Sequence, residues 1–473
     1  MQTANEITNK WATLVAGSAL LLNVASAQPQ YNAVDIGSLG GSSSFWPDPV
    51  YSDVDRGMEL TSTNGFSTIA LGINNSGQVV GVSYLSDNVT SHAFLYSGCA
   101  MTDLGTLGGG GATGTTNSCA TAINDNGQIA GISDISSTTN GPDAFLYSGG
   151  TMTDLGGICD EYNESYANGI NNSGQVVGQA LTDCEDGYGK PFLYIGGTMT
   201  QLIVPFWVSS TLQSGCYGIN ASGQIVGYSA AAIPDPNDYG HIIILGNQAF
   251  LYSGGGAIDL GSLCGGPDIP ATSYAYGINN NGEVVGVSDT IAVGSHAFLW
   301  NGIMTDLGTL GSSPSAAYGI NTNGQIVGAS YLSDNVTCHA FLYSTNSGTM
   351  LDLNNLVMNS IGTYLTTAYG INESGQIIAN GADGHAYLLT PASQVTPPPP
   401  PPPPRFLSIT LTNGMVIFTW STAPCYTYQV QHCWDLSTPC WKDFGGPITA
   451  TGYTLSTNDA INHPQRFYRV LAQ

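Results

Sequence analysis

One ten-residue phrase recurs along this 473-residue chain and constrains its fold more than any other feature. The phrase begins as Gly-Ile-Asn or Ala-Ile-Asn, passes through a short polar turn that contains glycine, and ends as Gln-Val-Val-Gly or a close variant. Its seven copies begin at positions 72, 122, 169, 218, 277, 319 and 370, at intervals of 42 to 59 residues. Self-similarity at such a period is the signature of a repeat architecture.

Each copy is followed by further strand-like phrases. A phrase related to His-Ala-Phe-Leu-Tyr follows all seven copies, at positions 92, 143, 190, 248, 296, 339 and 385. A phrase related to Met-Thr-Asp-Leu-Gly follows six of them, at positions 101, 152, 199, 257, 304 and 350. Short apolar runs separated by glycine-containing turns predict antiparallel strands joined by hairpins. Each repeat is therefore predicted to contain four strands.

The seventh copy lacks the last phrase, and the missing piece stands at the front of the chain as "AVDIGSLGG" from Ala33. An open repeat sheet would expose edges that invite aggregation, whereas a ring has none at its ends. The prediction is an all-β protein with a seven-bladed β-propeller over residues 28–392, built of four-stranded blades and closed by the N-terminal strand. An open β-repeat array is the structural alternative.

These phrases carry a family resemblance. "HAFLY", flanked by "GINxxGQVVG" and "MTDLGTLGG", resembles the HAF-repeat family of extracellular bacterial proteins over residues of about 31 to 391. The resemblance implies a repeat fold and an extracellular location, and it supplies no catalytic residues. Pro191, Gln201, Gln248 and Tyr387 depart from the motif.

The N-terminus predicts export. The run "WATLVAGSALLLNVA" precedes Ala25-Ser26-Ala27, which fits a secretory signal peptide over residues 1–27. No later segment reaches the roughly 18 apolar residues of a membrane-spanning helix. We expect a secreted, extracellular or cell-surface protein without a membrane span.

The charge is unevenly distributed. The formal net charge is −25, and residues 28–404 hold 28 acids and only two bases. Residues 405–473 hold three acids and four bases, Arg405, Lys442, Arg466 and Arg469. Because binding phosphates requires a basic surface, the acidic region excludes nucleic acid as a partner.

A proline-rich linker over residues 393–404, with eight consecutive prolines, predicts a semi-rigid spacer. Residues 405–473 alternate in "MVIFTW", "YTYQVQ" and "RFYRVL", which predicts a small β-sandwich. Through "TYQVQ", Trp441-x-Asp443 and the terminal "FYRV", this segment resembles the immunoglobulin-like or fibronectin-type-III-like modules of secreted bacterial proteins. The resemblance implies a role in surface anchoring or export.

The recurring histidines and aspartates do not predict a catalytic site. They occupy one position per repeat, whereas catalysis needs different groups converging at one place. We expect them to form structural hydrogen bonds, and we assign no catalytic or metal-binding residue. The mostly neutral Asn-x-x-Gly turns are likewise expected to satisfy their own backbone instead of holding calcium.

Function is expected in the loops that vary in length, namely those between the second and third strands and between blades. The binding candidates there are acidic and aromatic: Asp160, Glu161, Tyr162, Glu164, Asp183, Glu185, Asp186, Tyr188 and Trp207. Cys159 and Cys184 form a candidate disulfide beside them. The expected ligand is an extracellular glycan or a surface protein, with calcium as the one cofactor left open.

Three functions remain open at this point. The first is a non-catalytic propeller that binds through these loops. The second is a polysaccharide hydrolase or lyase using acids among Asp160, Glu161, Asp183, Glu185 and Asp186. The third is a purely structural surface protein with a solvated acidic rim.

Overall fold

A computed structural model describes residues 28–41, 66–108, 116–135, 141–158, 164–181, 189–204, 213–234, 242–264, 271–291, 294–394, 403–412, 415–422, 426–434, 436, 440–450, 454–460 and 466–472. The predicted signal peptide (1–27) and most of the predicted linker lie outside these residues. The described part is all-β: it contains no α-helix, and its only helical turns are the 3-10 segments η1 (Leu353–Leu356) and η2 (Ala392–Gln394). No helix in this part is long and apolar enough to cross a membrane.

Residues 28–394 form seven four-stranded antiparallel sheets where the structure describes them. The first four sheets follow the chain order. They are β2 (Thr68–Ile73), β3 (Val79–Tyr84), β4 (Ser91–Ser97) and β5 (Ala100–Asp103); β6 (Ser118–Ile123), β7 (Ile129–Ser133), β8 (Asp143–Ser148) and β9 (Thr151–Asp154); β10 (Ser165–Ile170), β11 (Val176–Leu181), β12 (Gly189–Ile195) and β13 (Thr198–Gln201); β14 (Ser214–Ile219), β15 (Ile225–Pro234), β16 (Ile242–Ser253) and β17 (Gly256–Gly261).

The fifth and sixth sheets repeat this order, and the seventh combines both ends of the region. They are β18 (Ser273–Ile278), β19 (Val284–Asp289), β20 (Ser295–Trp300) and β21 (Met304–Asp306); β22 (Ser312–Ile320), β23 (Gln325–Tyr331), β24 (Cys338–Ser344) and β25 (Thr349–Asp352); β26 (Leu365–Ile371), β27 (Ile377–Gly381), β28 (Ala386–Pro391) and β1 (Tyr31–Asp35). β1 pairs antiparallel with β28. The prediction that the N-terminal strand supplies the missing fourth strand is therefore confirmed.

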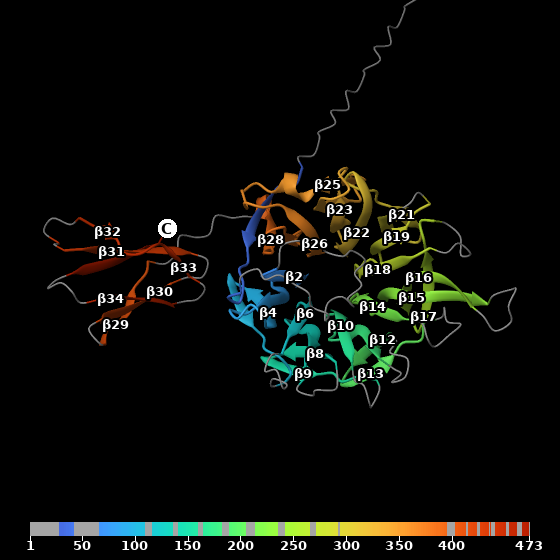
Figure 1. Ribbon diagram of the computed structural model, residues 1–473, viewed down its shortest axis with the longest axis horizontal. Coiled ribbons are helices and arrows are strands. Elements are labelled where there is room, and N and C mark those ends of the chain that lie inside the picture. The colour runs from blue at the N-terminus through green and yellow to red at the C-terminus, as the bar shows by residue number, and fades with distance from the viewer. Residues whose placement is uncertain are drawn as a thin grey trace, which may run out of the picture.

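The sheets lie side by side about a common centre, with the first strand of each nearest that centre (Figure 1). Each first strand contacts the first strand of the next sheet, and β26 of the last sheet contacts β2 of the first. Between neighbouring sheets lie separate hydrophobic clusters. Val80 and Ala93 of the first sheet, for example, pack against Ile129 and Phe145 of the second. The phenylalanine of the His-Ala-Phe-Leu-Tyr phrase is fully buried in six sheets because it fills this space.

Glycine recurs where chains approach too closely for a side chain. A Cβ at Gly286, in the second strand of the fifth sheet, would lie 1.9 Å from the carbonyl oxygen of Tyr274. A Cβ at Gly277, in the first strand, would lie 2.7 Å from the carbonyl oxygen of Tyr318 in the next sheet. Real Cβ contacts are longer than this, so the glycines of the repeated phrase are required by packing within and between sheets.

A belt of buried asparagines links all seven sheets. The belt consists of Asn74, Asn124, Asn171, Asn220, Asn279, Asn321 and Asn372. Each donates from Nδ2 to the backbone carbonyl of the next belt asparagine at 2.9–3.1 Å, and the last of these bonds runs from Asn372 to Asn74. Each Oδ1 also accepts the backbone N–H four residues later in its own turn. The expectation that these asparagines satisfy turn backbone is confirmed, and the same side chains also bridge neighbouring sheets.

The C-terminal part contains two further sheets. One consists of β29 (Phe406–Thr412), β30 (Met415–Ser421) and β34 (Thr454–Ala460). The other consists of β32 (Lys442–Asp443), β31 (Thr427–Cys433) and β33 (Ile448–Thr449), with β35 (Phe467–Ala472) also paired to β31. Phe418 and Trp420 of the first sheet share a buried cluster with Tyr428 and Val430 of the second, so the two sheets enclose one core.

Candidate functional site

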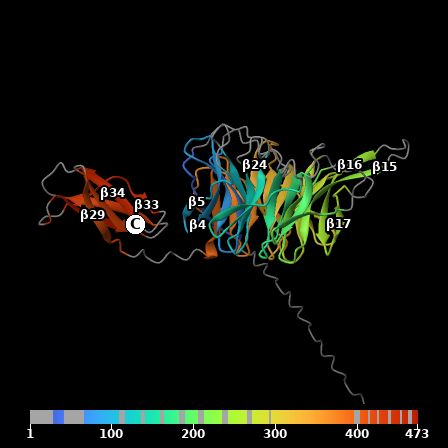
Figure 2. The ribbon, with the colours of Figure 1, turned by 90° about the horizontal axis from the view of Figure 1, so that it is seen from below.

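The connections between strands divide the seven sheets into two unlike sides. On the short-turn side, first-to-second connections have four or five residues and third-to-fourth connections have two to four. On the variable-loop side, second-to-third connections have four to nine residues, and connections between sheets range from five to 32. Because the strands run antiparallel from one side to the other, the strand ends that bear the variable connections all lie on the same side of the sheets (Figure 2).

Most of the predicted binding residues lie outside the described residues. They are Asp160, Glu161, Tyr162, Asp183, Glu185, Asp186, Tyr188 and Trp207, together with the cysteines of the candidate disulfide, Cys159 and Cys184. Glu164 is described, and it is half-buried just before β10 on the variable-loop side. Its Oε2 accepts a hydrogen bond from the Tyr166 hydroxyl at 3.3 Å, and its backbone carbonyl accepts one from Leu181.

Two described loops on this side are built alike. They are the loops of the twin phrases "SYLSDNVT", in the first and sixth sheets. Asp87 accepts hydrogen bonds from Val89 N, Thr90 N and the Thr90 hydroxyl, and the Thr90 hydroxyl is the main reason that the pKa of this aspartate is lowered. Asp334 makes the same contacts in the sixth sheet. Each loop is therefore held in shape by its own aspartate.

The fixed loops present aliphatic side chains to solvent. Val89 is 65% exposed, its counterpart Val336 is 79% exposed, and Ile291 in the corresponding loop of the fifth sheet is 84% exposed. On the short-turn side, Ile303 is 75% exposed. Exposed aliphatic side chains thus occur on both sides of the sheets. On the variable-loop side, they are surrounded by connections that differ widely in length.

The repeated histidines pair with the repeated aspartates inside single sheets. The pairs are His92–Asp103 at 2.8 Å, His296–Asp306 at 2.9 Å, His339–Asp352 at 2.8 Å and His385–Asp35 at 2.7 Å, each through Nδ1. Three pairs join the third strand to the fourth strand, and in the seventh sheet His385 lies directly before the third strand β28. The expected hydrogen bonds of these residues are confirmed, and the four pairs stand in four different sheets. The described residues contain no group of three or more His, Cys, Asp or Glu side chains arranged to hold a metal ion.

The second sheet breaks this pattern. Asp143 occupies the histidine position, and Asp154 of the fourth strand occupies the position of the paired aspartate. Asp143 is buried, and its Oδ1 has no hydrogen-bond partner among the described residues. Burial, followed by the neighbouring Asp154 carboxylate and then Glu164, raises the pKa of Asp143 to about 7. Two carboxyl groups this close can share one proton, whereas two negative charges repel each other.

A cavity of about 240 Å³ lies at the common centre of the sheets. Its wall is formed by the same three consecutive positions of every first strand, immediately before the belt asparagine. A β-bulge falls at the first of these positions in all seven sheets. A bulge re-aims a side chain, and here the bulged residue faces the cavity. These residues are Leu71, Thr121, Asn168, Tyr217, Tyr276, Tyr318 and Tyr369.

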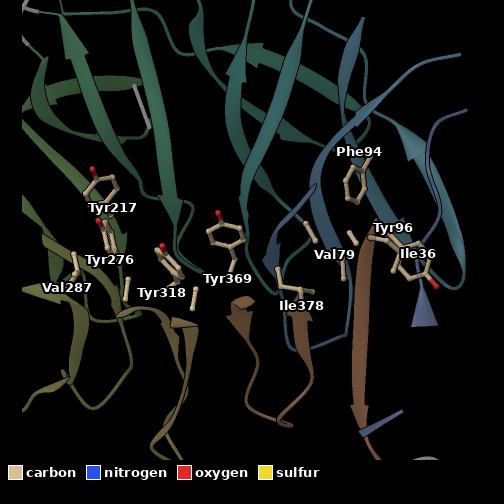
Figure 3. Packing of buried hydrophobic residues seen from close by; sticks show 14 of the residues in the cluster. Ile36, Val79, Phe94, Tyr96, Tyr217, Tyr276, Val287, Tyr318, Tyr369 and Ile378 are labelled. Carbon is tan, nitrogen blue, oxygen red and sulfur yellow. The ribbon is translucent and has the colours of Figure 1, made fainter. Parts of the chain in front are cut away.

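The cavity wall is aromatic along one arc only. The four tyrosines of the fourth to seventh sheets stand in a row with their hydroxyl ends turned the same way (Figure 3). Neighbouring ring centroids are 5.0–5.4 Å apart. Thr121 and Asn168 instead donate hydrogen bonds to backbone carbonyls of the next sheet. Sequence reasoning missed this cavity, although one signal was present: the residue before Gly-Ile-Asn varies while its neighbours recur.

No protein-family model matches the chain, and no curated protein matches it. Among solved structures, one match is a triple arginine-to-alanine mutant of AofleA from Arthrobotrys oligospora. That match has 10% sequence identity and a TM-score of 0.31, and it covers 61% of this chain and 86% of the other. At this TM-score the likeness supports no inference about fold or function.

Proposed function

We propose that this chain is a secreted, non-catalytic seven-bladed β-propeller of the HAF-repeat type. In this proposal the variable-loop side binds an extracellular partner, either a polysaccharide or a protein of a cell surface. The C-terminal part, a β-sandwich of immunoglobulin-like or fibronectin-type-III-like kind, acts as an accessory module. The recurring phrases and the signal-like N-terminus support the family and the location.

Two hydrogen bonds between the last and first sheets, together with the N-terminal strand of the last sheet, support a closed ring. Asn372 donates to the Asn74 carbonyl at 3.0 Å, in the geometry of the other six belt contacts. Ala70 N donates to Asn380 Oδ1 at 3.0 Å, which adds a second link between these sheets. β1, from the front of the chain, completes the seventh sheet. A ring closed in this way leaves no end sheet with an unpaired face.

The observation that carries the binding function is the division between the two sides. A repeat that only had to pack would keep all its connections short, yet the connections on one side range from four to 32 residues. Variable loops on a rigid scaffold are where binding usually resides. In the seven sheets, each described histidine pairs with an aspartate of its own sheet, and the four pairs stand in four different sheets, which favours binding over catalysis.

The proposal is tested by screening the purified full chain on a glycan array, with hydrolysis and lyase assays on every glycan that binds. We expect binding without turnover. The triple variant Val89→Glu, Ile291→Glu, Val336→Glu should lose that binding at least tenfold. The matched control Ile303→Glu, on the short-turn side, should bind like the parent. Turnover of a bound glycan would contradict the non-catalytic function, and an equal loss in the control would contradict the assignment of the side.

A further inference from the structure

The C-terminal part holds two arginines that stack on tryptophans, and their surroundings differ. The guanidinium of Arg466 lies 4.3 Å from the ring centre of Trp434, and the same guanidinium forms an ion pair with Asp459. The guanidinium of Arg469 lies 4.4 Å from the ring centre of Trp441. Among the described residues, no carboxylate lies within ion-pair distance of Arg469. One stacked cation is therefore neutralised internally, and the other is not.

Arg469 is held in place by a row of side chains that crosses three strands. Gln431 of β31 stands opposite Arg469 of β35 on one side and Asp443 of β32 on the other. Arg469 Nε donates to Gln431 Oε1 at 2.8 Å, and Gln431 Nε2 donates to Asp443 Oδ1 at 2.8 Å. Among the residues that the structure describes, the guanidinium donates one hydrogen bond, through Nε, which leaves its two terminal nitrogens for a ligand. A planar guanidinium fixed by stacking and by its Nε presents those nitrogens as a ready fork for a carboxylate.

The row lies on the outer face of its sheet. Tyr428 and Val430 alternate with Gln431 along β31 and are buried in the core between the two sheets. Because successive strand residues point to opposite faces, Gln431 and its partners point away from that core. Leu471, two residues after Arg469, is 38% exposed on the same face. Arg469 itself is half-buried on this face, and the exposed Leu471 adds an apolar group beside it.

We propose that this outer face, centred on Arg469 and Trp441, is a binding site for an acidic polysaccharide whose sugars carry carboxylates. A uronate residue offers a carboxylate to the arginine fork, hydroxyl groups to Asp443, and a pyranose face to the neighbouring apolar surface. A densely charged polyanion such as nucleic acid fits less well, because the Asp443 carboxylate lies in the row. This site is separate from the variable-loop side and does not depend on it.

The test uses the purified full chain and affinity electrophoresis in gels that contain polygalacturonate, with dextran as the neutral glycan. At low salt we expect retardation by polygalacturonate and none by dextran. Arg469→Gln should weaken the apparent affinity by at least about tenfold, in line with loss of a charge-assisted pair. Arg469→Lys, which keeps the charge but lacks the fork, should recover only part of the affinity. Far-UV circular dichroism and thermal melting establish that each variant remains folded.

The matched control is Arg405→Gln, which removes one exposed cation from the same part of the chain, and it should bind like the parent. The proposal is overturned if the parent shows no retardation, if Arg469→Gln binds normally, or if Arg405→Gln loses as much affinity as Arg469→Gln. Equal binding to poly-glutamate would overturn the assignment to a glycan. The Val89→Glu, Ile291→Glu, Val336→Glu variant should keep its polygalacturonate binding, so failure at one site is distinguishable from failure at the other.

Discussion

Replacing Asp143 with asparagine should make the protein more stable at neutral pH and remove a specific pH dependence. The folded pKa of Asp143 is raised from 3.8 to about 7 by burial and by Asp154. At pH values between these two pKa values, Asp143 is therefore protonated in the folded protein and ionised in the unfolded chain. Proton uptake on folding stabilises the protein at low pH, and this stabilisation is lost as the pH rises from about 4 to 7.

The magnitude follows from the same pKa values. Each unit of pKa shift corresponds to about 1.4 kcal/mol, so the loss between pH 5 and pH 8 is at most about 2.6 kcal/mol. Screening by solvent around the exposed Asp154 lowers the expected loss to about 1–2 kcal/mol. The asparagine variant carries no titrating group at this position. Its stability relative to the parent should therefore rise by about 1–2 kcal/mol across that pH range.

The assay is urea unfolding of the parent and of Asp143→Asn at pH 5, 6, 7 and 8, monitored by tryptophan fluorescence. Asp143→His should show a gain of the same sign, because it restores the His–Asp pairing present in four other sheets. Asp334→Asn serves as the control, since this exposed aspartate has its pKa lowered to about 2 and is ionised throughout the range. A difference between parent and Asp143→Asn that does not change with pH would refute the reasoning.

Three further predictions concern packing and burial. Gly227→Ala would place a Cβ 2.0 Å from the carbonyl oxygen of Gly215. The free energy of unfolding of this variant should therefore be about 2–3 kcal/mol below that of the parent. A value equal to that of the parent would contradict the packing argument. Asn321→Ala removes the donor to the Asn372 carbonyl and the acceptor of its own turn. The free energy of unfolding, measured by chemical denaturation, should fall by about 3–5 kcal/mol. A fall of less than about 1 kcal/mol would argue against the belt. Burial raises the pKa of the Cys216 thiol, so the folded protein should resist modification by iodoacetamide at this residue at pH 8. Mass spectrometry should detect the modification only after urea unfolds the chain. Rapid labelling of Cys216 in the folded protein would be inconsistent with its buried position.

Much of the strand pattern could be predicted from the sequence because the same succession of strand-like phrases and turns recurs in each repeat. The glycine turns, the apolar runs and the missing last phrase located the strands and the role of the N-terminal segment. The asparagine belt was only half predictable. The contacts of each asparagine within its own turn follow from local sequence. Its contact with the next sheet involves a residue 42 to 59 positions away, or 298 positions for Asn372 and Asn74.

The central cavity and the Asp143 pair needed the structure for a different reason. The variation of the residue before Gly-Ile-Asn is visible in the sequence, but a β-bulge leaves no mark in a hydrophobic pattern, so the direction of that side chain needed the structure. The replacement of histidine by Asp143 is visible in the sequence, yet its consequence depends on burial and on the proximity of Asp154. Among the predicted binding residues, the described part of the chain tests only the position of Glu164.

The ring itself is tested most directly by removing its closing strand and returning it as a peptide. A chain lacking Tyr31–Gly41 loses the pairing of β1 with β28 and the fully buried Tyr31 side chain. The account predicts a melting temperature several degrees below that of the parent, restored by a synthetic peptide of residues 28–41 and not by a scrambled one. A truncated chain that melts like the parent, with or without the peptide, would contradict a ring closed by the N-terminal strand.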